Sequence, residues 1–407
     1  MNPRLRFKKA DGTEYPDWEE KKLGELIYPT GSKNKNNLDL ESFSINNEKG
    51  FVSQKEQFEN AGYLNNADRS RSIIVSPNSF AYNPARINIG SIGYQNIGKD
   101  VLISPLYEVF KTTDKINDKF LMNYFRTKNF KNNISLYSEG SVRFIFSFKK
   151  MCLIDFNLPC LEEQEKIGNF LSDIDEVILA SDQEVKKLQE LKKGAMQKIF
   201  SQEIRFKKSD GTNYPNWEEK KLTDYLEFKN GINANRDSFG TGIKLISVSD
   251  ILNNDYITYD VIRNKINIDE KTKKLYEVNY GDILFQRCSE TLEEAGSANV
   301  YLDNQTAVFG GFVIRGKKIG EYNPIFFNHL LKSSSVRMEI KKKAQGAQHI
   351  NIGQDLLSTI IFFIPCLEEQ QKIGDFLSDF DEAISLAKQE LEKWKLLKKG
   401  LLQQMFI

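Results

Sequence analysis

The chain has 407 residues, of which 40% are hydrophobic and 12% aromatic, and its formal net charge is +1. These values predict two or three domains with cores of their own and exclude a largely disordered chain. Four cysteines without a CxxC pair and only two histidines argue against a disulfide framework and a zinc site. The N-terminus lacks an apolar segment, and no stretch approaches the length of a membrane span. We therefore expect a soluble, cytoplasmic protein with no membrane partner.

Two segments of the chain occur twice. Arg6–Leu23 and Arg205–Leu222 agree at fifteen of eighteen positions, and so do Pro159–Glu176 and Pro365–Glu382. Between these near-copies lie two long stretches that barely resemble each other. A period of about 200 residues indicates duplicated domains rather than the units of a solenoid. The sequence therefore predicts one repeated frame that holds two different domains.

The first variable block, residues 24–158, is predicted to mix strands and helices. β-branched and aromatic residues predict strands at Ile73–Val75, Val101–Ile103 and Tyr107–Phe110, and a helix is expected at Asp118–Thr127. Turn-forming residues separate these segments. Short strands broken by turns indicate a mixed domain rather than a helical bundle.

A long helix is predicted next, from Leu161 to Phe200. Its apolar residues recur at alternating spacings of four and three, which is the heptad pattern of a coiled coil. Acidic residues in the first turn and lysines in the last turn match the helix dipole. Gly168 interrupts the helix at a cost of about 1 kcal/mol. A close approach of another backbone would explain this glycine, and so would inheritance from one ancestral copy.

The second half of the chain repeats this plan. Strands are predicted at Lys244–Val248, Asp282–Phe285 and Ala307–Ile314, and a helix at Pro324–Ser333. The second copy of the long helix carries the same heptad seam, with Gly374 at the place of the first glycine. A long helix thus follows each variable block, and the apolar stripes of the two helices match and can pack against each other.

The repeats also imply a circular arrangement. The first helix ends at Phe200 and leads into Arg205, while the second ends one residue before the chain end and the chain begins just before Arg6. We infer that the termini lie close in space and that a pseudo-twofold axis relates the halves. Two helices perpendicular to such an axis run antiparallel. The predicted fold is α+β, with two mixed α/β domains joined by two long helices in an antiparallel coiled coil.

This order of segments resembles the specificity subunit of type I restriction–modification systems. The motif W-E-x-x-K-L (Trp18–Leu23, Trp217–Leu222) and the helix start P-x-L-E-E-Q-x-K-I carry the resemblance, which covers essentially the whole chain. Cys160 and Cys366 stand where many members carry proline. The resemblance divides the chain into a first target recognition domain (1–158, with repeat segment 6–23), a first spacer helix (159–204), a second target recognition domain (205–364, with repeat segment 205–222) and a second spacer helix (365–407).

The resemblance implies a function in DNA recognition. Gly281–Arg287 looks like the family's strand-and-loop segment, and Ser76–Arg86 looks like its counterpart. In this family each recognition domain reads one half of a split, asymmetric site on double-stranded DNA. The helices set the gap and dock two modification (methyltransferase) subunits, and restriction (motor-nuclease) subunits join them. The chain itself would be non-catalytic and without a cofactor, while S-adenosylmethionine, ATP and Mg²⁺ would serve the partner subunits of this phage-defence complex, an adenine DNA methyltransferase and ATP-dependent endonuclease.

Two motif fragments point to other functions, and both are incomplete. Gly93–Lys99 fits most of a P-loop, but Asp100 replaces the Ser/Thr and the next residues predict a strand. Asn323–Phe326 resembles the N-P-P-[FY] motif of adenine methyltransferases but lacks the second proline, and no glycine-rich dinucleotide turn occurs. The alternatives are therefore an enzyme with a fused reader, and a coiled-coil tether that binds two proteins through its variable blocks.

Basic clusters at equivalent places are candidates for phosphate contacts. Basic residues are in excess in residues 24–158, and acidic residues are in excess in the two long helices. This distribution of charge is expected if a variable block contacts a polyanion. A small-residue loop follows each cluster, and backbone amides with flanking cations can hold phosphate there. For any single lysine a solvated helix face is the alternative. The clusters are Arg126, Lys128 and Lys131, before the loop Gly140–Arg143, and Arg337 with Lys341–Lys343, before the loop Gly346–His349.

Base contacts are expected from forked side chains at loop tips, because Arg, Asn and Gln match purine edges. Asparagine-rich loops also serve simply to turn the chain. The complete set of predicted DNA-binding residues is Arg69, Arg71, Asn83, Arg86, Gln95, Arg126, Lys128 and Arg143 in the first block, and Asn233, Arg236, Gln286, Arg287, Arg337, Lys341, Lys342, Lys343 and His349 in the second.

Overall fold

The structure is a computed structural model that describes residues 3–47, 49–57, 69–138, 144–233, 236–344 and 350–406. The chain folds into two compact units. Unit 1 combines Met1–Asp182 with Glu390–Ile407, and unit 2 is Gln183–Gln389. The two divisions fall inside the long helices, so each of these helices contributes one part to each unit.

The strands of unit 1 are β1 (Glu19–Lys22), β2 (Ile27–Pro29), β3 (Ser32–Lys33), β4 (Phe43–Asn46), β5 (Gly50–Ser53), β6 (Ile73–Val75), β7 (Ser79–Tyr82), β8 (Ile92–Gln95), β9 (Val101–Ile103), β10 (Glu108–Thr112) and β11 (Asp155–Leu158). The central sheet is antiparallel with the order β2-β10-β7-β8. A second sheet has the order β3-β6-β9, and β1 pairs with β11. The predicted strands at 73–75 and 101–103 are confirmed.

Unit 2 contains β12 (Glu218–Lys221), β13 (Leu226–Asn230), β14 (Phe239–Ile246), β15 (Lys265–Ile266), β16 (Glu277–Val278), β17 (Ile283–Gln286), β18 (Cys288–Ser289), β19 (Ala298–Val300), β20 (Ala307–Phe309), β21 (Val313–Lys318), β22 (Ile350–Asn351) and β23 (Ile361–Ile364). Its central sheet, β13-β21-β17-β19, has the plan of the first, and β12 pairs with β23 as β1 does with β11. The second sheet, β15-β14-β20-β16, is larger than its counterpart.

The single strand predicted at Ala307–Ile314 is wrong. It is two strands, β20 and β21, separated by a turn in which the Val313 N–H donates to the Gly310 carbonyl at 2.9 Å. The two strands belong to different sheets. The chain crosses from one sheet to the other at this turn, which the apolar run Ala307–Ile314 did not indicate.

The short helices are α1 (Gln54–Gln57), α2 (Asp118–Tyr124), α3 (Lys128–Ser138) and α4 (Phe148–Cys152) in unit 1, and α6 (Val248–Leu252), α7 (Glu270–Tyr276), α8 (Pro324–Lys332), α9 (Ser334–Lys343) and α10 (Gln354–Ser358) in unit 2. The predicted helix at 118–127 is shorter in the structure because Thr127 bonds back to the Tyr124 carbonyl and then accepts from the Phe130 N–H of α3. Asn117 and Asn323 cap α2 and α8 in the same way.

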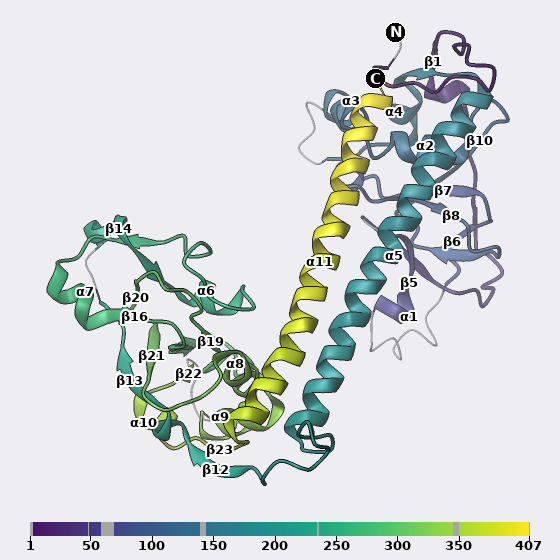
Figure 1. Cartoon of the computed structure of the whole chain (residues 1–407). Helices are drawn as coiled ribbons and strands as arrows, with labels where there is room; N and C mark the ends of the chain where they lie inside the picture. The colour runs from purple at the N-terminus through teal and green to yellow at the C-terminus, as the bar shows by residue number, and fades with distance from the viewer. Residues whose placement is uncertain are drawn as a thin grey trace. The chain divides into compact units, whose positions relative to one another are not determined.

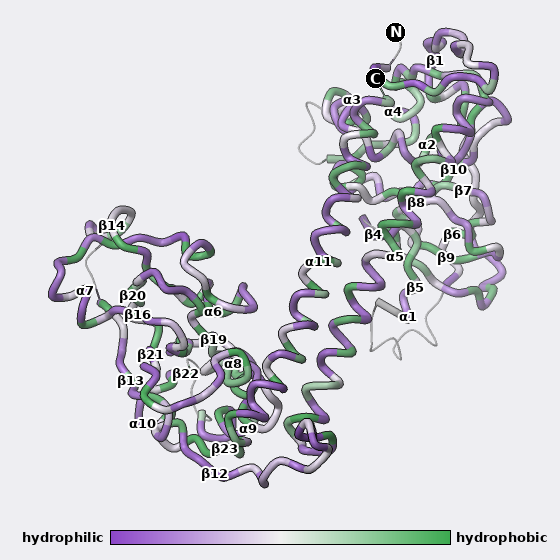
Figure 2. Tube along the Cα trace, in the orientation of Figure 1, coloured by the Kyte–Doolittle hydropathy of each residue, from purple (hydrophilic) through white to green (hydrophobic). Residues whose placement is uncertain are grey.

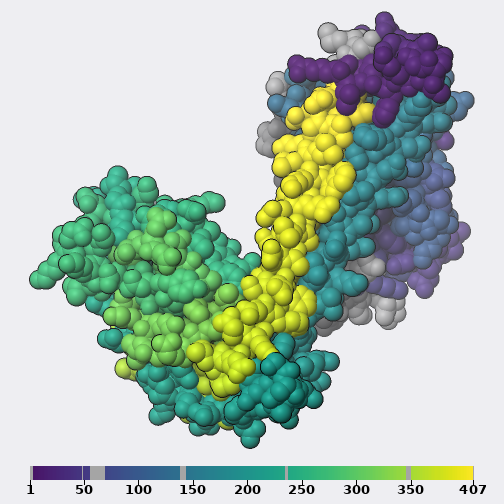
Figure 3. Space-filling model, in the orientation of Figure 1, coloured from purple at the N-terminus to yellow at the C-terminus, as the bar shows by residue number. Residues whose placement is uncertain are grey.

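The long helices α5 (Leu161–Phe200) and α11 (Leu367–Met405) lie side by side in each unit (Figures 1 and 3). In unit 1, Ile167 near the start of α5 shares a core with Met405 at the end of α11. In unit 2, Ile199 near the end of α5 shares a core with Ile373 near the start of α11. The helices are therefore antiparallel in both units, as predicted. Figure 2 shows apolar residues recurring along each helix, as the heptad pattern requires.

The repeated segments form the same joint in each unit. Arg6 reaches the fully buried Glu163 with two hydrogen bonds, of 3.0 and 2.8 Å, and the Trp18 indole donates to the same carboxylate. Arg205, Trp217 and Glu369 repeat this arrangement in unit 2. A buried carboxylate requires such partners, so the near-identity of the repeats follows from the joint that fastens each long helix to its unit.

Two equivalent hydrogen bonds show the circular arrangement of the repeats. Where the chain is continuous, the Ile204 N–H donates to the Lys198 carbonyl at 3.1 Å; at the chain ends, the Leu5 N–H donates to the Gln404 carbonyl at 3.0 Å. Phe406 stacks on Phe120 with centroids 5.0 Å apart in unit 1, and Phe200 packs on Phe326 at 5.8 Å in unit 2. The termini therefore meet as the sequence predicts.

The close approach of another backbone is confirmed for Gly168, where an added Cβ would lie 3.0 Å from the Phe120 nitrogen, whereas at Gly374 the nearest atom is a side-chain oxygen. A Cβ on Gly168 would lie 3.0 Å from the Asn117 Oδ1, and one on Gly374 would lie 2.8 Å from the Asn323 Oδ1. These asparagines cap α2 and α8, so each glycine lets a short helix begin directly against a long one. The glycines thus have a packing role in both units.

Candidate nucleic-acid interface

One end of the central sheet of unit 2 gathers loops that carry predicted residues. The antiparallel order places the ends of β13 and β17 beside the starts of β21 and β19. Asn233 follows β13, Arg287 follows β17, and the glycine turn precedes β21. The Arg287 N–H donates to the Phe312 carbonyl at 2.9 Å, and its Nη1 donates to Gly311 at 3.3 Å. Asn233 is exposed and covers Gly311, so that a Cβ added there would clash with the Asn233 Oδ1 and would displace this side chain.

The same end of the central sheet in unit 1 carries Asn83 and Arg86. They follow Tyr82, which pairs with Glu108 at the start of β10. Arg86 is exposed. The Asn83 Oδ1 accepts from the Ala85 N–H at 2.9 Å, so this side chain shapes its own turn. The two variable blocks therefore bring predicted residues to equivalent places although their sequences differ.

The basic helices lead to these same sheet ends. After α3, the Phe146 N–H donates to the Pro84 carbonyl at 2.9 Å; after α9, the Ile352 N–H donates to the Arg287 carbonyl at 2.7 Å. The predicted phosphate loops, residues 140–143 and 346–349, lie outside the described residues, and with them Arg143 and His349. The side chain of Arg236 also lies outside them.

Two predicted base readers lie in a different environment from the one expected. Gln95 is fully buried, and its Nε2 donates to the Val75 and Lys99 carbonyls at 3.2 and 2.7 Å. Gln286 is 4% exposed and donates to the Cys288 carbonyl at 2.9 Å. The expectation that they occupy loop tips is wrong. Each is the last residue of a strand, is buried, and donates hydrogen bonds from its side chain to backbone carbonyls.

Three predicted arginines are engaged within the protein. Arg69 pairs with Asp39 at 2.8 Å, and Arg126 pairs with Asp175 at 2.8 Å. Arg337 donates from Nη2 to the Glu293 and Ala295 carbonyls at 2.7 and 2.9 Å, and burial lowers its pKa. Arg337 thus holds a loop in place, which corrects the expectation of a surface cation.

The remaining predicted cations differ in exposure. Lys341 lies 3.4 Å from Glu293, and Lys343 lies 2.9 Å from Glu339 and donates to Thr359. The exposed side chains of the predicted set that have no hydrogen bond or ion pair within the described part of the chain are Arg71, Arg86, Lys128, Asn233 and Lys342. With Arg287, these are the residues available to an external polyanion.

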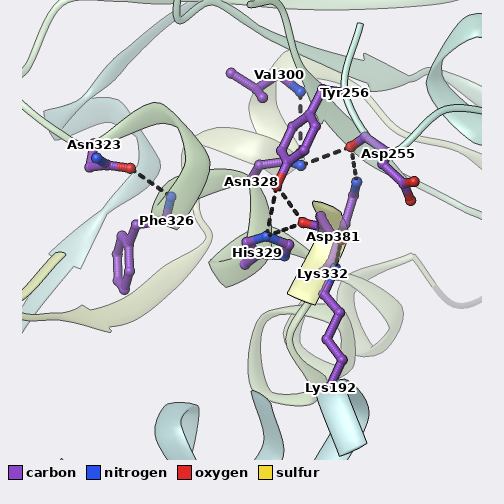
Figure 4. A network of polar contacts seen from close by, with 10 residues as sticks. All are labelled: Lys192, Asp255, Tyr256, Val300, Asn323, Phe326, Asn328, His329, Lys332 and Asp381. Atoms are coloured by element: carbon purple, nitrogen blue, oxygen red, sulfur yellow. Dashed lines mark hydrogen bonds and ion pairs between the residues drawn. The ribbon is translucent and has the colours of Figure 1, made fainter. Parts of the chain in front are cut away.

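The residues that resembled catalytic motifs have structural roles. Asn323, from the methyltransferase-like fragment, is the N-cap of α8 and accepts from the Phe326 N–H at 2.9 Å (Figure 4). The P-loop-like segment leads into strand β9 rather than a helix, as its sequence predicts. In the ranges that the structure describes, no helix is long and apolar enough to cross a membrane.

A polar clasp joins the long helices within unit 2, and sequence reasoning missed it (Figure 4). Lys192 of α5 pairs with Asp381 of α11. The Tyr256 hydroxyl donates to Asp381, and the His329 Nε2 lies 3.1 Å from it. We call Lys192, Asp381, Tyr256 and His329 the second clasp, because they fasten the helix pair to the variable domain of this unit.

Electrostatics favours a charged aspartate in the second clasp. Burial raises the pKa of the Asp381 carboxyl, but hydrogen bonds from His329, Lys192 and Tyr256 outweigh burial and hold the pKa well below its usual value. Burial lowers the pKa of His329. The imidazole is therefore neutral at pH 7 and the clasp charge is carried by Lys192 and Asp381.

Unit 1 has an equivalent first clasp, formed by Asp175, Lys398 and Arg126. Lys398 of α11 pairs with Asp175 of α5, which also accepts from Arg126 at 2.8 Å. Burial and the nearby Arg126 lower the pKa of Lys398 to about 8. The sequence held a signal for both clasps, because the spacing of 206 residues that aligns the helix repeats also relates Asp175 to Asp381 and Lys192 to Lys398.

A family of known proteins matches both halves of the chain. The family described as "Type I restriction modification DNA specificity domain" matches residues 15–209 and 214–395. The chain belongs to this family. It carries two DNA specificity domains, one for each variable block with its repeat segments.

Similar members of the family span almost the whole chain. The type I restriction enzyme MjaVIII specificity subunit of Methanocaldococcus jannaschii is 24% identical over 97% of this chain and 94% of its own length. The putative type I restriction enzyme MjaX specificity subunit of the same organism is 23% identical with the same coverage. A crystal structure of a type I restriction–modification S subunit from M. genitalium matches with a TM-score of 0.59 at 13% identity, covering 100% of this chain and 99% of that one. These matches show the fold of the two specificity domains.

Proposed function

We propose that this chain is the DNA sequence-recognition subunit of a type I restriction–modification complex and that each specificity domain reads one half of an asymmetric, bipartite site on double-stranded DNA. One observation carries the proposal. The two central sheets have the same strand order, and the same end of each presents exposed polar residues that differ between the domains. One scaffold with two different sets of side chains is what two different half-sites require.

The proposal assigns DNA contacts by exposure. Arg71, Arg86 and Lys128 would serve the first half-site, and Asn233, Arg287 and Lys342 the second. Forked side chains at the sheet ends suit base edges, whereas the lysines at or near α3 and α9 suit phosphates. The clasps would keep the helix pair in one register, so that the distance between the two readers sets the gap between half-sites.

The proposed subunit is non-catalytic and acts through partners. Two modification subunits would dock on the long helices and bring S-adenosylmethionine, and restriction subunits would bring ATP and Mg²⁺. Exposed leucines on the outer faces, such as Leu179 (58%), Leu386 (57%) and Leu396 (64%), support a role of the helices in protein binding. The place of action would be the cytoplasm, where cellular DNA is accessible.

Exchange of one variable block tests the proposal. Residues 24–158 are replaced by the corresponding block of another family member, and the methylated DNA sequence is determined for the complex with its modification subunits. We expect one half-site to change and the other half-site and the gap to persist, because unit 2 is untouched. A change in both half-sites would contradict modular reading.

A further inference from the structure

An exposed apolar side chain occurs at the same topological position in both domains. Leu106 is 75% exposed and Phe312 is 69% exposed. Strand register relates them. Tyr28 of β2 pairs with Lys111 of β10, and at the equivalent place of unit 2 Glu227 of β13 pairs with Lys317 of β21. Leu106 precedes Lys111 by as many residues as Phe312 precedes Lys317, so the two side chains stand at equivalent positions before the central sheet.

The two side chains also occupy the same place in the same turn. The Tyr107 N–H donates to the Ser104 carbonyl at 3.1 Å, and the Val313 N–H donates to the Gly310 carbonyl at 2.9 Å. Leu106 and Phe312 are therefore the third residues of equivalent four-residue turns. Each turn carries the chain from the second sheet, at β9 or β20, into the central sheet.

The sequences of the two turns differ completely, Ser-Pro-Leu-Tyr and Gly-Gly-Phe-Val. Turn positions usually carry glycine, asparagine, aspartate or serine, so a large apolar residue is not required by the turn itself. Neither side chain supports the core, since both are exposed. An exposed apolar residue in the same place of two otherwise different domains indicates a contact that the two domains share.

Their surroundings identify the contact. The turn of Phe312 is tied to Arg287, whose N–H and Nη1 hold the Phe312 and Gly311 carbonyls, and Asn233 covers the same turn. The turn of Leu106 lies beside the segment with Asn83 and Arg86, which extends from the partner strand of β10. Apolar side chains beside Arg and Asn are the combination that contacts base edges, where they meet the thymine methyl group or a base step.

We propose that Leu106 and Phe312 are equivalent specificity-determining residues, each of which makes an apolar contact with the bases of one half-site. This inference rests on the proposed function and deepens it. It assigns the sheet ends a shared mode of reading in which a fixed apolar tip is flanked by polar side chains that vary between domains. Leu106 would contact the half-site of the first domain and Phe312 that of the second.

The test uses the complex of this chain with its modification subunits. The probes are a duplex with the split sequence that the wild-type complex methylates and every single base-pair substitution of it. Phe312→Ala should reduce discrimination about 10-fold at one or two adjacent positions of one half-site, a factor typical of losing one base contact. Leu106→Ala should do so in the other half-site. Phe312→Leu, which introduces the residue type of the first domain, should retain more discrimination than Phe312→Ala.

One exposed apolar residue in each domain serves as a control. Ile319, 57% exposed, follows β21 at the opposite end of the strand from Phe312, and Leu136, 66% exposed, lies on α3. Alanine at either position should leave discrimination unchanged. Unchanged discrimination with Phe312→Ala and Leu106→Ala, or an equal loss in both half-sites, would overturn the inference. So would a loss of subunit assembly alone, which would indicate a protein contact. In each case the wild-type and control complexes still report whether the chain reads DNA.

Discussion

At the residue scale, Arg337 and Lys342 show how neighbours on one helix take different roles. Both belong to the basic cluster of α9, but Arg337 is bonded to two loop carbonyls whereas Lys342 is exposed. Arg337→Ala should lower the free energy of unfolding by about 1–3 kcal/mol, because two carbonyls lose their donor. Lys342→Ala should leave stability unchanged and reduce the slope of log affinity for DNA against log salt by about 1.

Chemical denaturation and DNA binding at several salt concentrations separate these roles. The two variants are each other's controls, since both remove one charge from the same helix. An unchanged unfolding free energy for Arg337→Ala, together with a reduced salt slope, would mean that this arginine serves DNA instead of the loop.

The second clasp predicts a pH dependence. The pKa of Asp381 is lowered in the fold, so its charge stabilises the protein above the ordinary carboxyl pKa of about 4, and this contribution is lost as the pH falls through the lower folded pKa. Asp381→Asn should therefore cost about 3 kcal/mol at pH 7, because Lys192 loses its partner. The difference from wild type should shrink below about pH 4.

Unfolding of both proteins across this pH range gives the measurement. Taking the difference removes the contribution of other carboxylates, which act equally in both. Asp175→Asn in the first clasp is the control, since its position is equivalent but it lacks the tyrosine and histidine partners. A difference for Asp381→Asn that stays constant down to pH 2 would contradict the assignment.

Sequence reasoning at this scale succeeded where it named exposed residues and failed where burial decides. Arg71, Arg86, Lys128, Asn233 and Lys342 are exposed as expected. Gln95 and Gln286 have the same chemistry but end buried strands, and Arg337 spans a loop. Residue type alone does not tell these cases apart, because an amide or guanidinium that is useful to DNA is equally useful to an unpaired carbonyl.

At the element scale, two glycines of the long helices make a matched pair within unit 2. A Cβ on Gly374 would meet Asn323, whereas one on Gly194 would meet nothing within 4 Å. Gly374→Ala should lower stability by about 1 kcal/mol, since displacement of the α8 cap outweighs the gain in helix propensity. Gly194→Ala should raise stability by up to about 1 kcal/mol. Thermal unfolding of the two variants measures both effects, and equal gains would contradict the packing role of Gly374.

The elements themselves were predicted unequally. The helix Leu161–Phe200 was found to the residue because a heptad seam of about three repeats lies between acidic residues in the first turn and lysines in the last turn. Short strands such as Ile73–Val75 were found from β-branched residues. The apolar run Ala307–Ile314 misled because a buried strand and two strands joined by a tight turn have similar composition. The pairing of strands into sheets was not predicted, since it depends on contacts distant in sequence.

At the scale of the whole molecule, the long helices predict an adjustable gap. Seven residues that continue the heptad are inserted in both helices where the units divide, between Asp182 and Gln183 and between Gln389 and Glu390. One heptad adds about 10 Å of helix and preserves the seam, so the methylated gap should lengthen by about three base pairs with both half-sites unchanged. Insertion in one helix alone is the control, because it mismatches the seam and should abolish recognition. An unchanged gap after the paired insertion would refute the ruler.

The central claim is that this chain selects the DNA sequence for a modification complex. The most direct measurement is the methylation of a whole genome in cells that contain the modification partner, with and without this chain. We predict a split motif with two different halves and a fixed gap, methylated only when the chain is present. Absence of such a motif, despite a stable complex between the chain and its partner, would contradict the account and favour a coiled-coil tether for proteins.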